Sequence, residues 1–256
     1  MSLEVKKKAT VSLAVANQKG GVGKTIIASH AAIYAEHNYK VVIVDLDPQA
    51  NATSIFKERG YKVELTMDLF QKEIDFSGIL NDPSNVVFSA TPELLNKELL
   101  DLNLFAENIR NLKQSYDNLF IVYDTPPVAG DLQIISLVCS DFAVSPIELS
   151  KFSIDGLSKL INTIQNIKSQ YNPDLEFVGI VANRVKKVSP LQNEVLASLK
   201  ESYSHLLLNP EIPERQVIEE AITDGLAVWE LSKSKLTGKQ MKLLQTEIFN
   251  RIESIN

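Results

Sequence analysis

The stretch Gln-Lys-Gly-Gly-Val-Gly-Lys-Thr at residues 18–25 has the composition and spacing of a loop that binds the phosphates of a nucleotide. Its glycines allow several backbone N–H groups to point at one phosphate, Lys24 can reach the terminal phosphates, and the hydroxyl of Thr25 can ligate Mg²⁺. We therefore expect a magnesium–nucleotide site. The loop residues expected to contact the nucleotide are Gly20, Gly21, Val22, Gly23, Lys24, Thr25 and Ile26.

The loop departs from the usual phosphate-binding pattern GxxxxGK[ST] at its head. Gln18 stands where the pattern has its first glycine, and a second lysine, Lys19, follows it. Lys19 cannot easily reach the phosphates that Lys24 reaches from the same chain, so its role needs a separate explanation. The alternative is a solvated lysine at the edge of the loop.

Two aspartates, Asp45 and Asp124, end apolar runs that are typical of buried strands. In an open parallel sheet, ligands lie at the carboxyl ends of strands, so both carboxylates are expected to point toward the phosphate loop. A single aspartate at a strand end is often structural, but a pair beside a phosphate loop favours a metal and water site. We predict that Thr25, Asp45 and Asp124 serve the metal.

The elements that must position these residues alternate between strand and helix. The apolar runs are continuous, which is typical of a parallel sheet buried on both faces. The predicted strands cover residues 11–16, 41–45, 85–89, 119–124, 142–146, 177–182 and 205–208. The predicted helices cover residues 24–37, 49–58, 92–116, 150–171, 189–203 and 235–254. We expect an α/β fold, a single-domain P-loop NTPase with a mostly parallel, twisted sheet and helices on both faces.

Composition supports one cytoplasmic domain and limits its partners. With 256 residues, 45% of them hydrophobic, the chain can bury one full core, so we expect a single domain over residues 1–256 with a flexible segment at 1–9. Lys and Arg number 26 against 32 Asp and Glu, so no global positive field holds nucleic acid or an anionic membrane. Cys139 is the one cysteine, which excludes a disulfide framework and is typical of a small core residue. The first apolar run is too short for a signal peptide, which predicts a cytoplasmic protein.

Three motifs together resemble the ParA group of deviant Walker ATPases, which partition plasmids and chromosomes. They are KGGVGKT in the phosphate loop, VVIVDLDPQANAT at residues 41–53 and FIVYDTPP at residues 120–127. The resemblance implies an ATPase with ATP and Mg²⁺ as cofactors, in which Asp124 is the Walker B acid and Asp47 orients the attacking water. Asp47 followed by Pro48 is also a good helix start, so capping is the alternative role, and one residue can do both.

The resemblance also assigns a role to Lys19. In the family, this lysine reaches across a dimer, contacts the partner's nucleotide and offsets transition-state charge as an arginine finger does elsewhere. We therefore expect Lys19, Lys24 and Asp47 to be catalytic in a homodimer that forms when ATP is bound.

The second half of the chain resembles the parts of the family that contact adenine and DNA. Asn183 corresponds to an asparagine that contacts the base, because an amide can donate to and accept from an adenine edge. Pro213 lies in a segment that closes over the purine; Glu214 and Val217 stand there where several relatives carry arginines, with Arg215 between them. The candidate DNA-binding residues are Arg184, Lys186, Lys187, Arg215, Lys233 and Lys235. The alternative is that they are solvated charges.

The resemblance implies a partitioning ATPase whose ATP-bound dimer holds nonspecific DNA on the nucleoid and leaves it on hydrolysis, stimulated by a ParB-like centromere-binding adaptor. Only residues 1–10 precede the first predicted strand, so we expect a short form without an N-terminal DNA-reading domain. The alternatives are a MinD-like ATPase that acts on a membrane or protein cargo, and a small-molecule ligase or kinase. The MinD-like alternative depends on the apolar stripe Met241, Leu244, Ile248, Ile252 and Ile255. Its opposite side lacks a basic bias, so we expect it to pack against the sheet, without a membrane partner.

Overall fold

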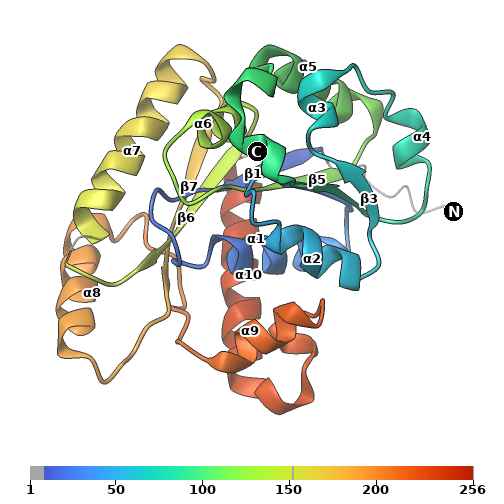
Figure 1. Cartoon of the computed structure of the whole chain (residues 1–256). Helices are drawn as coiled ribbons and strands as arrows, with labels where there is room; N and C mark the ends of the chain where they lie inside the picture. The colour runs from blue at the N-terminus through green and yellow to red at the C-terminus, as the bar shows by residue number, and fades with distance from the viewer. Residues whose placement is uncertain (1–8, 152, 256) are drawn as a thin grey trace, which may run out of the picture.

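The computed structural model describes residues 9–151 and 153–255, and these contain a seven-stranded sheet (Figure 1). The strands are β1 (Val11–Val15), β2 (Lys40–Asp45), β3 (Lys62–Leu65), β4 (Val86–Ser89), β5 (Leu119–Asp124), β6 (Phe142–Glu148) and β7 (Glu176–Asn183). Their order is β3-β4-β2-β5-β1-β6-β7, and every neighbouring pair is parallel. Asp124 lies in register with Val15 on one side and Asp45 on the other. The carboxyl ends of β1, β2 and β5 therefore meet at one edge.

The helices form a layer on each face of the sheet. They are α1 (Lys24–Ala35), α2 (Asn51–Glu58), α3 (Asp68–Gln71), α4 (Ser77–Leu80), α5 (Leu102–Ser115), α6 (Asp131–Val138), α7 (Ser153–Gln170), α8 (Pro190–Tyr203), α9 (Gln216–Thr223) and α10 (Lys235–Ile255). One core joins the sheet to α1, α2, α9 and α10, which Figure 1 shows together on one face, and a second joins it to α3, α4, α5, α6 and α7. The predicted α/β fold class is confirmed.

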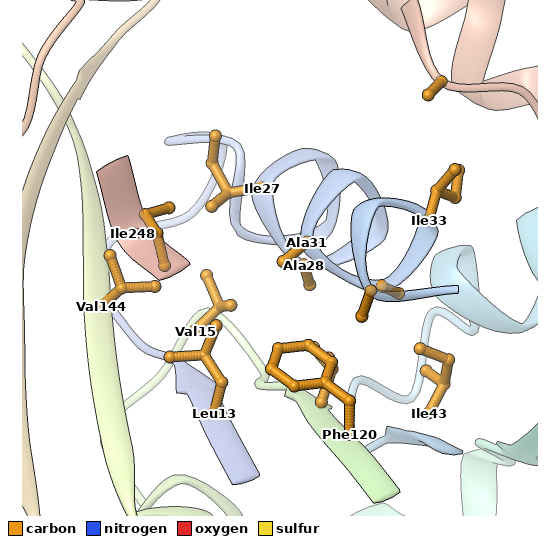
Figure 2. Packing of buried hydrophobic residues seen from close by; sticks show 14 of the residues in the cluster. Leu13, Val15, Ile27, Ala28, Ala31, Ile33, Ile43, Phe120, Val144 and Ile248 are labelled. Atoms are coloured by element: carbon orange, nitrogen blue, oxygen red, sulfur yellow. The ribbon is translucent and has the colours of Figure 1, made fainter. Parts of the chain in front are cut away.

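The helix that follows the phosphate loop is packed tightly against the centre of the sheet. Figure 2 shows Ile27, Ala28 and Ala31 of α1 facing the strands, with Phe120 of β5 below them and Ile248 of α10 at the side. All five side chains are buried. Burial of one large aliphatic side chain contributes about 1.5–3 kcal/mol, so α1 and the loop before it are held firmly on the sheet.

Six of the seven predicted strands are confirmed to within two residues. The strand predicted at residues 205–208 is wrong, because the chain there makes an isolated bridge between Ile180 and Leu207 and no strand. The seventh strand of the sheet is β3, which was not predicted and which lies at the edge of the sheet. Its sequence Lys-Val-Glu-Leu is polar at alternate positions and has no continuous apolar run, so the pattern used for buried strands misses it.

The helix predicted at residues 92–116 is wrong over its first ten residues. Two short 3₁₀ helices, η1 (Pro92–Leu95) and η2 (Lys97–Leu99), come first, and α5 begins only at Leu102. The carboxylate of Asp101 accepts hydrogen bonds from the N–H groups of Asn103 at 3.0 Å and Leu104 at 3.1 Å, which caps α5 there. The other five predicted helices are confirmed to within three residues, while α3, α4, α6 and α9 were not predicted.

The apolar stripe of α10 packs inside the protein. Met241, Leu244 and Ile248 are fully buried and Ile252 nearly so, whereas Ile255 at the end of the helix is half exposed. Its neighbours are α1 and β7, as expected for a helix that covers the sheet. The stripe is therefore not a free membrane-binding face. Among the described residues, no helix has the length and apolar character needed to cross a membrane.

Two smaller predictions concern single segments. Cys139 is half-buried beside the second core, and burial raises the pKa of its thiol to about 12, so the thiol is neutral at physiological pH. Residues 1–8 of the predicted flexible segment lie outside the described residues.

Candidate active site

The loop between β1 and α1 needs glycine at its last position. Gly23 has a φ of 94°, and a Cβ there would lie 2.1 Å from Nδ2 of Asn183. A side chain at this position would be strained and would displace Asn183. Asn183 itself donates from Nδ2 to the carbonyl of Val22 at 2.8 Å. The loop is thereby tied to the end of β7.

Asn17 fixes the head of the loop and was not predicted from the sequence. Its amide donates to Oγ of Ser145 at 3.2 Å and to the carbonyl of Pro146 at 2.9 Å, both in β6. Its Oδ1 accepts a hydrogen bond from the N–H of Lys19 at 2.8 Å. Asn17 is buried, so water does not compete strongly for the hydrogen bonds that join β1, β6 and the loop. The sequence signal that could have identified Asn17 is an asparagine directly after a buried strand and before the phosphate loop.

Lys24 is folded into the loop. The residue is only 6% exposed, and its ammonium donates to the carbonyl of Lys19 at 3.2 Å. Burial lowers the pKa of the Lys24 amine, while the carboxylates of Asp124 and Asp47 act in the opposite direction. Both carboxylates therefore lie close enough to interact with the lysine. The structure brings these three predicted residues together.

Thr25 and Asp124 form the pair best suited to a metal. The hydroxyl of Thr25 donates to Oδ2 of Asp124 at 2.7 Å, whereas Oδ1 of Asp124 is buried and lacks a hydrogen-bond partner among the described residues. Burial, and then the charge of Asp45, raises the pKa of Asp124 well above its ordinary value. A divalent cation would supply both the missing partner and the counter-charge, so these residues fit Mg²⁺. No group of three or more His, Cys, Asp and Glu side chains forms a metal site within the described ranges, so phosphates and water would complete the coordination.

Asp45 differs from Asp124 because its oxygens are already engaged. Oδ2 accepts from the N–H of Thr53 at 2.8 Å and from its hydroxyl at 2.7 Å, and Oδ1 accepts from the N–H of Asp47 at 3.1 Å. Burial raises the pKa of Asp45 to about 6, against the hydrogen bonds from Thr53, which lower it. A metal-ligand role for Asp45 stays a prediction, and this geometry favours a role in holding the loop that follows β2.

Asp47 lies in that loop, between β2 and α2. The capping alternative for Asp47 is wrong: α2 begins at Asn51, and its first turn is capped by Asp45 through the N–H of Thr53. Asp47 accepts instead from the N–H of Gln49 at 3.0 Å. Its charge acts on the pKa values of both Lys24 and Asp124, so Asp47 lies near the phosphate loop. Its role in orienting the attacking water stays a prediction.

Lys19 pairs with an acidic residue at the end of β6 and is largely exposed. Its ammonium lies 3.6 Å from Oε2 of Glu148, and its side chain is 52% exposed. A lysine in this position is accessible to a second molecule. Its contact with a partner's nucleotide stays a prediction.

A cavity of 220 Å³ lies beside the phosphate loop, between the end of β7 and the start of α9. It is lined by Ile26, Asn183, Arg184, Pro213, Glu214, Arg215, Gln216, Ile218 and Glu219. The structure thus brings together Asn183 and Pro213, the two residues predicted to contact the base. Its lining combines three apolar side chains with the amides of Asn183 and Gln216 and four charged residues. A cavity with apolar walls and polar groups, next to a phosphate loop, suits a purine.

The six candidate DNA-binding residues divide into two sets. Three of them are paired with glutamates, namely Arg184 with Glu219 (3.0 Å), Lys186 with Glu214 (2.8 Å) and Lys233 with Glu220 (2.7 Å). The other three make no ion pair with the described residues, and these are Lys187, Arg215 and Lys235. The cations are therefore not equivalent as DNA contacts.

The fold and the site together define a P-loop protein of the nucleotide-hydrolysing class, with a phosphate loop after β1 and a buried aspartate at the end of β5. Residues 10–177, more than half of the chain, match the family described as AAA domain. The chain is 31% identical to protein IncC of Escherichia coli over 94% of this chain and 70% of that protein. It is 28% identical to the chromosome-partitioning ATPase Soj of Thermus thermophilus over 94% of this chain and 96% of that protein.

A solved structure of a plasmid partition protein from Borrelia burgdorferi covers 95% of this chain and 100% of its own, with a TM-score of 0.70 and 21% identity. At this identity, the likeness shows the fold alone. The sequence matches go further, and the chain belongs to the matched family, in its ParA/MinD group of partitioning ATPases. The family predicted from the three motifs is confirmed, and with it an ATPase.

Proposed function

We propose that this chain hydrolyses MgATP to partition DNA: its ATP-bound homodimer holds nonspecific DNA, and hydrolysis releases it. The observation that carries the proposal is the meeting of Lys24, Thr25, Asp124 and Asp47 at one edge of the sheet, beside a cavity of the size of a base. The named relatives are consistent with it, since Soj of Thermus thermophilus is a chromosome-partitioning ATPase.

The residues of the site divide the work of hydrolysis. Backbone N–H groups of residues 20–25 and the ammonium of Lys24 bind the phosphates, and Asn183 and Pro213 hold the base. Thr25 and Asp124 would hold Mg²⁺, which when bound neutralises phosphate charge. Asp47 accepts a hydrogen bond from a water and directs it at the terminal phosphate, and such a positioned group accelerates a reaction on the order of 10²- to 10⁴-fold.

Lys19 would complete the site of a second copy. Its side chain is 52% exposed, and among the described residues its ammonium pairs with Glu148 alone, an exposed pair that is weak in water. In a dimer with the two nucleotides between the subunits, each Lys19 would contact the partner's nucleotide and offset charge in the transition state.

The DNA-binding surface that we propose uses Lys187, Arg215 and Lys235, the three cations that make no ion pair with the described residues. Lys239 and Lys242 line the same hollow of 600 Å³ as Lys235 on α10. The net charge of −6 opposes binding by the whole protein, so contact must be local, and a dimer would present two copies of the surface. Arg184, Lys186 and Lys233 contribute less because glutamates already neutralise them.

The test is binding to a random-sequence DNA fragment with ATP, with a slowly hydrolysed analogue and with ADP, while sedimentation follows dimerisation. ATP and the analogue should give both the dimer and DNA binding, and ADP neither. Between about 50 mM and 200 mM salt, affinity should fall roughly 100-fold if about four phosphates are neutralised. A DNA affinity that is the same with ATP and ADP, or the same at both salt concentrations, would overturn the proposal.

Partners and location follow from the same proposal. The protein would be cytoplasmic and associated with the nucleoid when ATP-bound, and a ParB-like centromere-binding adaptor would stimulate its ATPase. A fluorescent fusion should follow the nucleoid, whereas the same fusion with Lys24→Ala should be diffuse because it cannot hold the phosphates. A Lys24→Ala fusion that still follows the nucleoid would contradict nucleotide control.

A further inference from the structure

Thr53 joins three segments where the carboxyl ends of the strands meet the phosphate loop. It lies in the first turn of α2 and is only 3% exposed. Its hydroxyl donates to Oδ2 of Asp45, at the end of β2, and accepts from the N–H of Ala90, just after β4, at 3.1 Å. Its own N–H donates to the same Oδ2 of Asp45. Every hydrogen-bonding group that Thr53 directs to this junction is thus satisfied.

The other oxygen of Asp45 carries the connection onward to Asp47. Oδ1 accepts from the N–H of Asp47 at 3.1 Å, and the carbonyl of Asp45 accepts from the hydroxyl of Thr66 at 2.9 Å. Asp45 has no exposed surface, so water does not compete for these bonds. An unbroken line of hydrogen bonds therefore runs from Ala90 through Thr53 and Asp45 to the backbone of Asp47.

We propose that Thr53 is a positioning residue for ATP hydrolysis. Through Asp45, its hydroxyl fixes the backbone of Asp47 so that the Asp47 carboxylate stands at the right distance from the terminal phosphate. The proposal rests on the role proposed above for Asp47. It explains why Asp45 is buried with both oxygens engaged: it supports the loop, and Thr25 and Asp124 serve the metal.

The expected size of the effect follows from the geometry of attack. A displacement of about 1 Å in a positioning group can cost on the order of 100-fold in rate, even when binding is unchanged. Thr53 does not line the base cavity, and its hydrogen bonds to described residues go to Asp45 and Ala90 rather than to the phosphate loop. Loss of its hydroxyl should therefore lower kcat and leave the KM for ATP nearly unchanged.

The experiment compares Thr53→Val, which keeps the shape and removes the hydroxyl, with Thr53→Ser, which restores it. Ser54→Ala is the matched control, because the Ser54 hydroxyl is exposed and bonds to the carbonyl of Ala50, within its own helix turn. The readouts are kcat per bound nucleotide, KM, the melting temperature, and the Mg²⁺ dependence of binding of a fluorescent ATP analogue.

For Thr53→Val we expect kcat to fall about 10- to 100-fold with KM within about twofold and the Mg²⁺ dependence unchanged. Thr53→Ser should recover most of the rate, and Ser54→Ala should match the wild type. Wild-type kcat per bound nucleotide in Thr53→Val would reduce Thr53 to a structural role and overturn the proposal. A shift in Mg²⁺ dependence would overturn it too, because the network would then act on the metal.

Asp45→Asn tests the same line from its other end if Thr53→Val does not fold. Asparagine has one acceptor oxygen where aspartate has two, so it can accept from the N–H of Asp47 or from the N–H of Thr53, but its NH₂ then faces a donor on the other side. The line of hydrogen bonds is broken in either orientation, so kcat should fall without a change in KM. Wild-type kcat in this variant would also overturn the proposal. Asp47→Ala separates the proposed role of Asp47 from the proposed role of Thr53. If Asp47→Ala hydrolyses ATP at the wild-type rate, the role of Asp47 is refuted. If Asp47→Ala is inactive but Thr53→Val hydrolyses ATP at the wild-type rate, only the role of Thr53 is refuted.

Discussion

The catalytic edge, formed by residues 18–25, Asp45, Asp47 and Asp124, and the basic surface, formed by the six candidate DNA-binding residues, treat charge in different ways. At the catalytic edge, Lys24, Asp45 and Asp124 are buried, and fixed hydrogen bonds set their directions. At the basic surface, five of the six cations are exposed and Arg184 is half-buried, and half of the six are paired with glutamates. A buried charge interacts strongly with the few groups fixed around it, whereas the interactions of an exposed charge are weakened by water and salt and can form with many partners.

The largest expected effect tests whether the exposed Lys19 belongs functionally to the catalytic edge. In Lys19→Ala, ATP should still bind, but the dimer should not form and turnover should fall about 10³-fold, as for loss of an arginine finger. Lys151→Ala, at an exposed lysine three residues beyond Glu148, is the control. Sedimentation and ATPase rates check the result. A normal ATP-dependent dimer in Lys19→Ala would show that Lys19 is a solvated lysine without a role in the site.

The next largest expected effect concerns the stability contributed by a partly buried ion pair, which can be compared with the exposed pairs of the basic surface. Arg59 donates twice to Glu36, each time at 2.6 Å, and once to the carbonyl of Gly225 at 2.8 Å, with 15% of its side chain exposed. Arg59→Ala leaves the partly buried carboxylate of Glu36 without its cation, so the free energy of unfolding should fall by roughly 3 kcal/mol. Denaturant unfolding measures this loss.

Lys186→Ala is the exposed counterpart of that variant. It removes a pair of similar length whose partners are 54% and 37% exposed, and stability should not change measurably. Equal losses in Arg59→Ala and Lys186→Ala would show that burial does not separate the two kinds of pair.

A third effect concerns pH and the buried His30 in α1. Its Nδ1 lies 2.8 Å from the carbonyl of Ile26, its Nε2 accepts from the N–H of Val228, and burial lowers its pKa to about 4 despite the nearby Glu230. Below a pH of about 6.5 the unfolded chain binds this proton and the folded chain does not. Stability should therefore fall as pH drops from about 6.5 toward 4, by up to about 3 kcal/mol.

The measurement for His30 is the pH dependence of denaturant unfolding in wild type and in His30→Gln, whose amide can replace both hydrogen bonds. The variant should show a flatter dependence between about pH 6.5 and 4. The same slope in both proteins would assign the acid sensitivity to other groups.

The smallest effect divides the basic surface itself. The double variant Lys187→Ala, Lys235→Ala should weaken DNA binding by the ATP-bound protein roughly 10- to 100-fold and reduce the salt slope by about one for each lysine removed. Lys186→Ala, Lys233→Ala removes the same charge from the paired set and should have little effect. DNA-binding titrations at several salt concentrations compare the two, and equal losses would remove the distinction between the sets.

The two regions also differ in how far the sequence predicts them. The phosphate loop is contiguous, and its strand is a continuous apolar run, so both could be predicted directly. The support given by Asp45 could not, because it depends on Thr53 and Asp47 being folded onto one carboxylate. Thr53 stands within a recognised motif, but nothing in that motif shows where its hydroxyl points.

At the basic surface, the pairing partners lie far away in sequence. Lys186 meets Glu214 in the loop before α9, and Arg184 meets Glu219, 35 positions later, so only the fold reveals that these cations are neutralised. The capping residue Asp101, in contrast, is visible in the sequence. The long helix predicted at residues 92–116 did not take this helix start into account.

The DNA affinity of Asp47→Ala, measured with ATP and with ADP, tests nucleotide control of the basic surface most directly. If Asp47 drives hydrolysis and nucleotide controls this surface, the ATP-loaded variant should dimerise, bind DNA and stay bound, whereas the ADP form should not bind. Equal affinity with ATP and ADP, or prompt release from DNA with ATP at the wild-type rate, would contradict both assignments.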